Sequence, residues 1–461
     1  MTKKLLGIFV SAFLAMVFAF SCTPAQTPVD NEGPSVDPST LEALVATAPV
    51  PDNNFIFDAK PDFILKINNQ NKVPVSDKLS IKIFTDRRKI ITTLELGEFT
   101  VPASTIIDKE VTLDYDFEPG FYKAQCIIEE RVACTVDFGI RPTEIVSAPD
   151  MQEDFTTFWE DAISELKDNV QMNPKRTDLP GRTNIYLVEM NSIPDNITGE
   201  PAVIHAYLSI PKDASASKKY PVLIHFFGYD DQKPSGKLSG PSVAMSFIEL
   251  YVSTRGQMIN NRTADQRSDG IDVDFHNNYG DWFAFNFGLR DNYYYRGAYM
   301  DCVQAVRFVE TLEEADLNNI FAEGNSQGGA FSYACAALSP RPLAGIAPGV
   351  AFMGDFPDYF QIAGWPANIA KANKGSMTDD EMYAFLSYFD TKNLATRVSC
   401  PIMATMGLKD TTCPPHTNIA PFNNAKTPAE DKVMYYYPNM GHQIAPDWDS
   451  MVKKFFKAHM K

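Results

Sequence analysis

The sequence is poor in positive charge. It has 41 lysines and arginines against 58 aspartates and glutamates, which gives a formal net charge of −17. Negative charge on this scale opposes binding to nucleic acid or to anionic membrane surfaces. The composition therefore predicts no nucleic-acid partner and suits a protein that acts on neutral substrates.

Closely spaced cysteines are also missing, because none of the seven cysteines forms a C-x-x-C pair, the usual mark of a zinc site. We predict no metal site. Cys126 and Cys134 flank "IIEERVA", a pattern that predicts a β-hairpin turning near Glu130. The sequence leaves open whether these two form a disulfide or remain unpaired core cysteines. The four other cysteines after Cys22 are Cys302, Cys335, Cys400 and Cys413.

Long apolar runs are absent after residue 20. Before it, Lys3 and Lys4 precede an uncharged run, and "AFSC" follows at residues 19–22. We interpret residues 1–21 as a lipoprotein signal peptide and Cys22 as its lipidated cysteine; a plain signal peptide cleaved nearby is the alternative. Both readings predict an exported protein. Lipidation would anchor it to a bacterial membrane, on the periplasmic or the cell-surface face.

Three segments of different amino-acid composition follow the predicted signal peptide. Residues 22–48 are rich in Pro, Thr, Ser and acids, which predicts a flexible tether. Residues 49–143 contain short alternating runs such as "DFILKIN", typical of a small all-β sandwich of immunoglobulin-like type. From 144 to 461 apolar strands alternate with amphipathic helices, so we predict an α/β fold there: a mostly parallel sheet with helices on both faces.

One serine lies in a glycine-rich turn. "GNSQG" at residues 324–328 fits G-x-S-x-G, with the strand-like "NIFAEG" before Ser326 and a helical pattern after it. Strand, tight turn and helix form the nucleophile elbow of α/β-hydrolases, which presents the hydroxyl at the sheet edge. The alternative is a glycine-rich turn with an incidental serine.

A serine nucleophile needs a base, and the scarcity of histidine allows elimination. The six are His205, His225, His276, His416, His442 and His459. His205 and His225 lie in apolar strands, His276 in a polar loop and His459 on the last helix. His442 follows the last predicted strand, where the base belongs in the Ser, acid, His order of this fold. We choose His442, with His416 second.

The acid should lie between serine and base in the chain, on a loop after a late strand. Asp410 follows "IMATMG" and is our choice; Asp355 competes, but we interpret it as a helix cap. The two backbone N–H donors of an oxyanion hole should come from Gln327, next to the serine, and from the Gly228–Tyr229 loop.

Beyond this pattern, the chain from about residue 150 onward resembles the acetyl xylan esterases and cephalosporin-C deacetylases, a carbohydrate esterase family of α/β-hydrolases. The motifs that carry the resemblance are "DFTTFWEDAISEL", "FFGY", Arg255-Gly256-Gln257, "YYYRGAYMDCVQAVRFVE", "GNSQGG", "SYFDTKNLATRVSCPI", "GLKDTTCPP" and "NMGH".

The resemblance implies a catalytic triad of Ser326, Asp410 and His442, with the Tyr229 and Gln327 amides as oxyanion donors. It implies a structural role for Arg255, Gly256 and Gln257 beside the serine. It also implies hydrolysis of acetyl esters on sugars without metal or cofactor, and a homo-oligomer. Two departures stand out: Gln443 follows the histidine where the family usually has glutamate, and residues 22–143 lie outside the family core.

From the sequence we predict a serine esterase that removes O-acetyl groups from carbohydrate such as acetylated xylan. Two alternatives are kept. One is a serine hydrolase of the same fold for peptides or bulkier acyl groups. The other is a polysaccharide-binding lipoprotein whose hydrolase domain is inactive.

Overall fold

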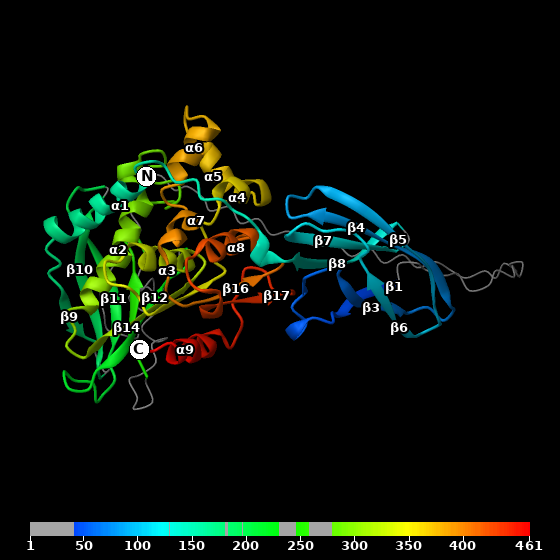
Figure 1. Ribbon diagram of the computed structural model, residues 1–461, viewed down its shortest axis with the longest axis horizontal. Coiled ribbons are helices and arrows are strands. Elements are labelled where there is room, and N and C mark those ends of the chain that lie inside the picture. Colours follow the sequence, from blue (N-terminus) through cyan, green and yellow to red (C-terminus); the bar gives the residue numbers. More distant parts are fainter. Residues whose placement is uncertain (1–40, 129, 180–182, 196, 230–245, 258–278) are drawn as a thin grey trace, which may run out of the picture.

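The computed structural model describes residues 41–128, 130–179, 183–195, 197–229, 246–257 and 279–461 (Figure 1). The predicted signal peptide, Cys22 and most of the predicted tether lie outside these ranges. In the described part of the chain, no helix combines the length and the apolar character needed to cross a membrane.

Two β-sheets form the part of the chain before residue 143. A three-stranded sheet has the order β1-β3-β6, and a five-stranded sheet has the order β2-β8-β7-β4-β5. Their bounds are β1 Leu41–Thr47, β2 Ile56–Phe57, β3 Asp62–Asn69, β4 Val75–Thr85, β5 Ile90–Val101, β6 Ile106–Thr112, β7 Gly120–Ile128 and β8 Arg131–Ile140. Leu65 and Ile67 of β3 share one core with Ile81 and Ile83 of β4, because alternate residues of each strand point inward. This confirms the predicted all-β layers.

Strand β1 lies where the sequence predicted tether, so that part of the prediction is wrong. β1 pairs antiparallel with β3, and Leu41 and Ala43 are buried in the core. The apolar residues of "LEALVAT" explain why this stretch joins the sheet although its surroundings are polar.

The predicted hairpin around Glu130 is confirmed. β7 and β8 are antiparallel, and Cys126 lies directly opposite Cys134 in their register. Both thiols are free in the structure, with Cys126 buried and Cys134 half-buried.

Residues after 143 build a nine-stranded sheet with the order β17-β16-β15-β14-β12-β13-β11-β10-β9. The strands are β9 Lys175–Asp178, β10 Ile185–Pro194, β11 Pro201–Ser209, β12 Tyr220–Phe226, β13 Ile248–Ser253, β14 Ala315–Asn325, β15 Gly345–Gly349, β16 Ile402–Gly407 and β17 Lys432–Tyr437. β12 to β17 run parallel, whereas β9, β10 and β11 pair antiparallel at one end. The predicted mostly parallel sheet is confirmed.

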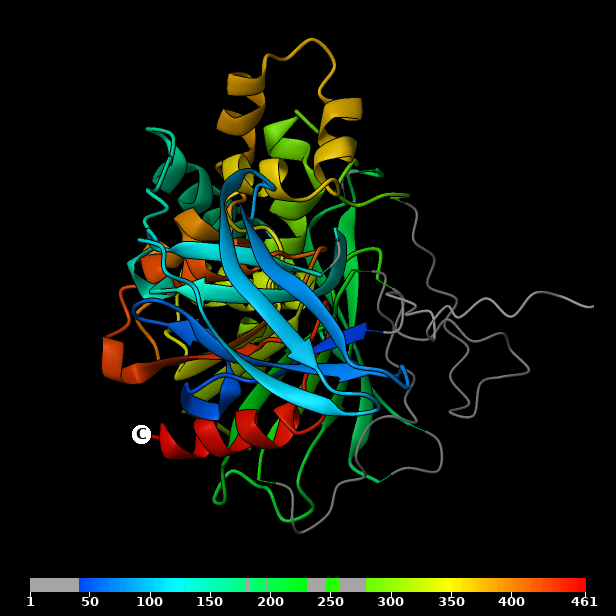
Figure 2. The same cartoon turned by 90° about the vertical axis from the view of Figure 1, so that its right-hand side faces the viewer.

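Helices cover both faces of this sheet (Figures 1 and 2). The helices are α1 Phe155–Ser164, α2 Tyr294–Val309, α3 Gln327–Leu338, α4 Phe356–Ile362, α5 Ala367–Asn373, α6 Asp379–Leu386, α7 Thr391–Leu394, α8 Pro415–Asn424 and α9 Trp448–Ala458. On one face Val222 and Ile224 pack in the core with α2 and α3. On the other, Leu223 and Phe321 pack against Trp448 and Phe456 of α9.

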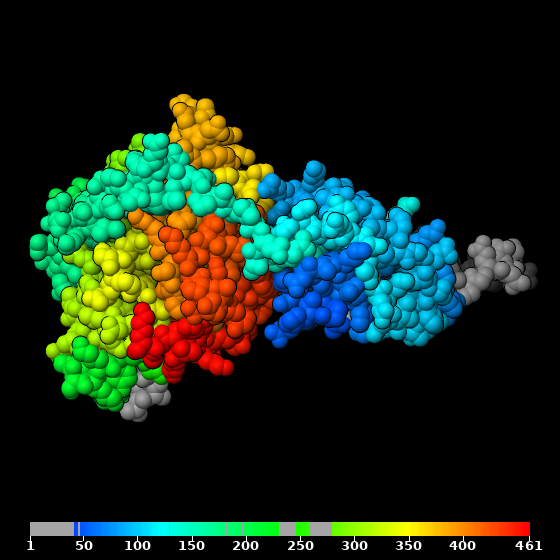
Figure 3. Space-filling model, viewed as in Figure 1, coloured from blue at the N-terminus to red at the C-terminus, as the bar shows by residue number. Residues whose placement is uncertain are grey.

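The two β-sheets before residue 143 form a first module, which sits against the α8 side of the second module, residues 144–461 (Figure 3). Asn423 of α8 donates hydrogen bonds of 3.0 Å to the carbonyls of Pro142 and Ile145. Arg87, after β4, forms an ion pair with Asp358 of α4. These contacts join the first module and the segment after it to α8 and α4.

Candidate active site

Ser326 occupies a tight turn between β14, which ends at Asn325, and α3, which begins at Gln327. Its backbone has φ 58° and ψ −119°, a conformation that non-glycine residues rarely adopt and that costs roughly 1–3 kcal/mol. Surrounding hydrogen bonds hold it: the Ser326 carbonyl accepts from the N–H groups of Gly329 and Phe352, each at 3.0 Å. The predicted strand, turn and helix around this serine are confirmed.

Gly328 lets this turn pack against the end of β12. A Cβ placed there would lie 2.3 Å from the carbonyl oxygen of Phe226. A side chain at this position would therefore push apart the serine turn and the segment that leads to Gly228 and Tyr229.

The structure brings Ser326, His442 and Asp410 together, although they come from three loops. Ser326 Oγ lies 2.9 Å from His442 Nε2, and His442 Nδ1 lies 2.8 Å from Asp410 Oδ2. In the tautomer with the proton on Nδ1, the imidazole donates to Asp410 and accepts from the Ser326 hydroxyl. This is the alignment that a serine nucleophile and its base require.

Asp410 is fully buried, and backbone groups fix its carboxylate. Its Oδ1 accepts hydrogen bonds from the N–H groups of Thr412 and Cys413 at 2.8 and 2.9 Å. The other oxygen is thereby aimed at His442, whose side chain is 28% exposed. Burial raises the pKa of the Cys413 thiol, which lies beside Asp410 and Ser326 and therefore stays protonated at neutral pH.

Gln327 and the Gly228–Tyr229 loop lie close to the serine turn. Gln327 is the first residue of α3, and N–H groups in the first turn of a helix have no partner within the helix. Its buried side chain accepts a 2.7 Å hydrogen bond from the Tyr295 hydroxyl. Sequence reasoning missed Tyr295, because nothing in the spacing links it to Gln327.

Gln257 holds the other loop. Its Nε2 donates a 2.8 Å hydrogen bond to the Gly228 carbonyl, and its Oε1 accepts from the N–H and hydroxyl of Thr254. Gly256 has φ 78°, and a Cβ there would lie 2.7 Å from the Tyr279 ring.

Arg255 fixes the same segment through its contacts with Asp301. Its guanidinium forms two hydrogen bonds with the Asp301 carboxylate, at 3.0 and 2.8 Å, and both side chains are buried. Asp301 also accepts from the Arg255 N–H at 2.9 Å. The triplet thus contacts the loop at Gly228 through the Gln257 side chain, and its structural role beside the serine stays a prediction.

Aromatic rings cluster around Tyr229, the residue expected to supply one oxyanion donor. The Tyr229 ring contacts Trp282 and Trp365, with centroids 4.9 and 5.7 Å away. Trp365 stacks on Phe352 at 5.0 Å, and the Phe352 N–H is bonded to the Ser326 carbonyl. The three rings therefore form one aromatic cluster, which is joined to the serine turn through the Phe352 backbone.

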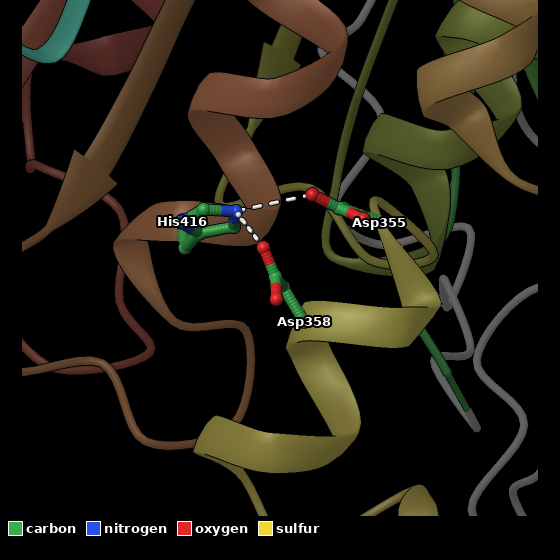
Figure 4. A group of neighbouring side chains, drawn as sticks. All are labelled: Asp355, Asp358 and His416. Atoms are coloured by element: carbon green, nitrogen blue, oxygen red, sulfur yellow. Dashed lines mark hydrogen bonds and ion pairs between the residues drawn. The ribbon is translucent and has the colours of Figure 1, made fainter. Parts of the chain in front are cut away.

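A second serine and histidine also meet, away from Ser326. Ser147 Oγ lies 3.3 Å from His416 Nε2, but Asp355 and Asp358 contact that same nitrogen at 3.0 and 3.1 Å (Figure 4). The other nitrogen faces Asp86 at 3.7 Å. A catalytic base needs a hydrogen-bonded acid on one nitrogen and its serine on the other. Asp86 is too far from Nδ1 for a hydrogen bond, and two carboxylates compete with Ser147 for Nε2, so this arrangement does not prepare a base.

The charge state of His416 also argues against a role as catalytic base. Burial opposes its charge, but the hydrogen bonds with Asp355 and Asp358 outweigh that effect and raise the pKa of His416 to about 9. The imidazole is therefore protonated at neutral pH and cannot accept a proton from a hydroxyl. His416, the second choice from the sequence, does not lie with Ser326.

Asp355, Asp358 and His416 also have the composition of a cation site, since their ligand atoms lie within 4.8 Å of one another. Cationic side chains already neutralise the carboxylates: Lys392 Nζ lies 3.0 Å from Asp355, and Arg87 pairs with Asp358. We interpret the group as an ionic network that ties α8 to α4.

Asp355 stands at the start of a helix but does not cap it with its side chain, so the predicted capping role is wrong. Asp355 precedes α4, but its side chain makes no capping hydrogen bond and binds Lys392 and His416 instead. Asp390 caps the start of α4 instead. Its carboxylate accepts hydrogen bonds from the N–H groups of Asp355 and Phe356 at 2.8 and 2.9 Å.

Three of the remaining histidines lie in the described structure. His205 and His225 are buried in β11 and β12, as predicted, and His459 lies just after α9 with its side chain partly buried. His276 lies outside the described residues.

The mostly parallel sheet with a strained serine between β14 and α3 defines the class of the second module as an α/β-hydrolase. Residues 143–460 match the sequence model of the family described as "Acetyl xylan esterase (AXE1)". The chain therefore belongs to the acetyl xylan esterase family of carboxylic ester hydrolases.

Individual relatives agree with this assignment. The acetyl esterase Axe7A of Xylanibacter ruminicola is 27% identical over 387 residues, which cover 81% of this chain and 83% of that protein. The structure of an acetyl xylan esterase from Paenibacillus sp. R4 superposes with a TM-score of 0.57 and 26% identity, covering 69% of this chain and 98% of that one. Acetyl xylan esterase 1 from Thermoanaerobacterium sp. JW/SL YS485 shares the fold, with a TM-score of 0.57 and 23% identity over 70% of this chain and 98% of that one.

Proposed function

We propose that this protein hydrolyses O-acetyl esters of carbohydrates, with Ser326 as nucleophile, His442 as base and Asp410 as acid. The observation that carries the proposal is the pair of hydrogen bonds, 2.9 and 2.8 Å, that joins the three side chains in line. Family membership and the names of the relatives support an acetyl group as the acyl part and an acetylated carbohydrate as substrate.

The reaction proceeds in two steps. His442 Nε2 takes the Ser326 proton while Oγ attacks the acetyl carbonyl, and the Gln327 and Tyr229 amides stabilise the oxyanion. The protonated His442 then gives its proton to the sugar oxygen, which leaves as an alcohol, and an acetyl group stays on Ser326. Water attacks that ester by the same route, which releases acetate and restores the serine.

The aromatic cluster supports a small acyl group. Tyr229 packs on Trp365, which stacks on Phe352, so the proposed oxyanion donor Tyr229 belongs to an aromatic cluster, and such an apolar neighbour suits a methyl group. Comparing p-nitrophenyl acetate with the butyrate and octanoate tests this. We expect kcat/KM to fall as the acyl chain lengthens, and preference for long chains or for peptides would favour the alternative hydrolase.

The proposed function is tested by acetate release from acetylated xylan and xylo-oligosaccharides. We expect release by the wild-type protein and a loss of at least about 10³-fold for Ser326→Ala. Acetate release that is unchanged in Ser326→Ala would contradict the triad. Xylan binding without any release would favour a binding lipoprotein.

We further propose that the protein is exported and held to a bacterial membrane through lipidated Cys22. The proposal rests on Lys3, Lys4, the uncharged run and "AFSC" at residues 19–22. Homo-oligomer formation, which the family resemblance implies, stays a prediction.

A further inference from the structure

A cavity of about 410 Å³ lies between the two modules. One wall is the five-stranded sheet, at β4, β7 and β8; the other is the segment Leu408–Thr411 after β16, with Pro414 and Pro415 at the start of α8. Figure 1 shows β7 and β8 facing α8 and β16 across this junction. The volume falls in the range of roughly 300–1,000 Å³ that small-molecule sites occupy.

The sheet wall presents one row of three side chains across three strands. Phe84 of β4 lies opposite Lys123 of β7, and Lys123 lies opposite Asp137 of β8. Directly opposed residues point to the same face of a sheet, so all three line the cavity together. Lys123 Nζ and Asp137 Oδ1 form an ion pair at 3.1 Å. The row combines an apolar ring with a donor and an acceptor.

Asp137 carries a hydrogen-bond acceptor that the protein does not use. The residue is 8% exposed, and its Oδ2 has no hydrogen-bond partner within the described ranges. A buried acceptor left unpaired is unfavourable, because the hydrogen bonds it makes with water in the unfolded chain are not replaced. A ligand hydroxyl in the cavity would satisfy this oxygen.

The opposite wall is the loop that carries Asp410. Asp410 lines the cavity, and its carboxylate is bonded to His442, which is bonded to Ser326. The loop that carries Asp410 therefore borders the cavity, while the Asp410 carboxylate itself is enclosed. A substrate that occupies this cavity while its ester group lies at Ser326 must therefore be a chain of several linked units.

We propose that this cavity is a carbohydrate subsite, which holds a sugar unit of the same chain whose acetylated unit lies at Ser326. Sugar rings match the row, because one face is apolar C–H surface that packs on an aromatic ring while the hydroxyls reach charged donors and acceptors. The proposal rests on the proposed function and deepens it: the substrate is an acetylated oligosaccharide or polysaccharide, and the N-terminal module contributes to its binding.

Binding of unacetylated xylotetraose to the Ser326→Ala protein, measured by titration calorimetry, tests the subsite without turnover. We expect saturable binding that weakens about tenfold when Asp137→Asn is added, because a hydrogen bond to a charged acceptor is lost. Asp108→Asn, an exposed change on β6 in the other sheet, is the matched control and should leave Kd unchanged. No xylotetraose binding, or equal Kd for all three proteins, would overturn the proposal.

A kinetic ratio provides the second arm and uses Phe84→Ala in the otherwise wild-type chain. We expect the ratio of kcat/KM for acetylated xylotetraose over that for p-nitrophenyl acetate to fall about tenfold. The subsite is wrong if wild-type protein deacetylates xylotetraose and Phe84→Ala leaves this ratio unchanged. The proposed function itself is wrong if wild-type protein cleaves p-nitrophenyl acetate but releases no acetate from acetylated sugars.

Discussion

At the scale of single residues, the orientation of Asp410 decides which tautomer His442 adopts. The Asp410 Oδ1 is occupied by two backbone N–H groups, so Oδ2 faces His442 Nδ1. In Asp410→Asn the amide oxygen would keep the backbone contacts, and the NH₂ group would face Nδ1. Nδ1 would then have to accept, which leaves the proton on Nε2, where it blocks uptake of the serine proton.

We therefore expect Asp410→Asn to lower kcat on p-nitrophenyl acetate by about 10³–10⁴-fold with little change in unfolding temperature. Asp431→Asn, at a more exposed aspartate near His459, serves as control and should retain full kcat. Activity of Asp410→Asn within tenfold of wild type would show that Asp410 does not set the tautomer.

His416 gives the protein a pH-dependent stability. Its pKa in the folded state is about 9, above the ordinary value of 6.5. A raised pKa of this kind contributes stability that is complete below about pH 6.5 and is lost as pH rises through about 9. The contribution is on the order of 3 kcal/mol.

Urea unfolding of the wild type and His416→Gln at several pH values measures this. We expect the difference in unfolding free energy between the two proteins to be largest near pH 6 and to shrink toward pH 9.5. A difference that stays constant over this range would refute the ionic role of His416.

At the scale of elements, the turn between β14 and α3 depends on close backbone contact with β12. Gly328→Ala would place a Cβ 2.3 Å from the Phe226 carbonyl oxygen, and two backbones must then separate. That displacement would move the Gln327 and Tyr229 amides apart. We expect kcat to fall by about 10²-fold or more, the cost of losing one oxyanion donor.

Gly364→Ala is a matched control for this change, because a Cβ at Gly364 meets no atom within 4 Å. Circular dichroism and kcat on p-nitrophenyl acetate should both stay near wild type for it. If Gly328→Ala is equally active, the close packing of this turn does not matter for the oxyanion donors.

Elements whose sequence pattern is local could be predicted from the sequence. The turn at Ser326, the strand before Asp410 and the position of His442 all follow from local patterns and chain order. Asp390 could not be predicted as the cap of α4, because it lies 35 positions from Asp355 and only the fold brings the two together. The hydrogen bond from Tyr295 to Gln327 and the ion pair of Asp301 with Arg255 could not be predicted for the same reason. β1 was missed because its apolar residues are surrounded by a Pro- and acid-rich stretch.

At the scale of the whole molecule, the two modules share a junction at the loop that carries Asp410. Arg87 and Asp86 of the first module reach Asp358 and His416 of the second. The junction cavity could not be predicted from the sequence, because the residues of the first module that line it lie mostly in ordinary alternating strands. Only the pairing of β4, β7 and β8 aligns Phe84, Lys123 and Asp137 into one row.

Attachment to a membrane belongs to the same scale and has its own test. In cells of a bacterium that lipidates exported proteins, we expect the full chain in the membrane fraction and Cys22→Ala in the soluble fraction, with equal specific activity. Metabolic labelling with a radioactive fatty acid should mark only the protein with Cys22. Membrane retention of Cys22→Ala would contradict a lipid anchor at this cysteine.

The most direct test of the mechanism is to find where the acetyl group sits during turnover. The protein is mixed with p-nitrophenyl acetate, quenched in acid within milliseconds, digested and analysed by mass spectrometry. The proposed mechanism predicts one added acetyl group on the peptide that contains Ser326, absent in Ser326→Ala. An acetyl group on the Ser147 peptide, or rapid turnover with no acetylated serine, would contradict it.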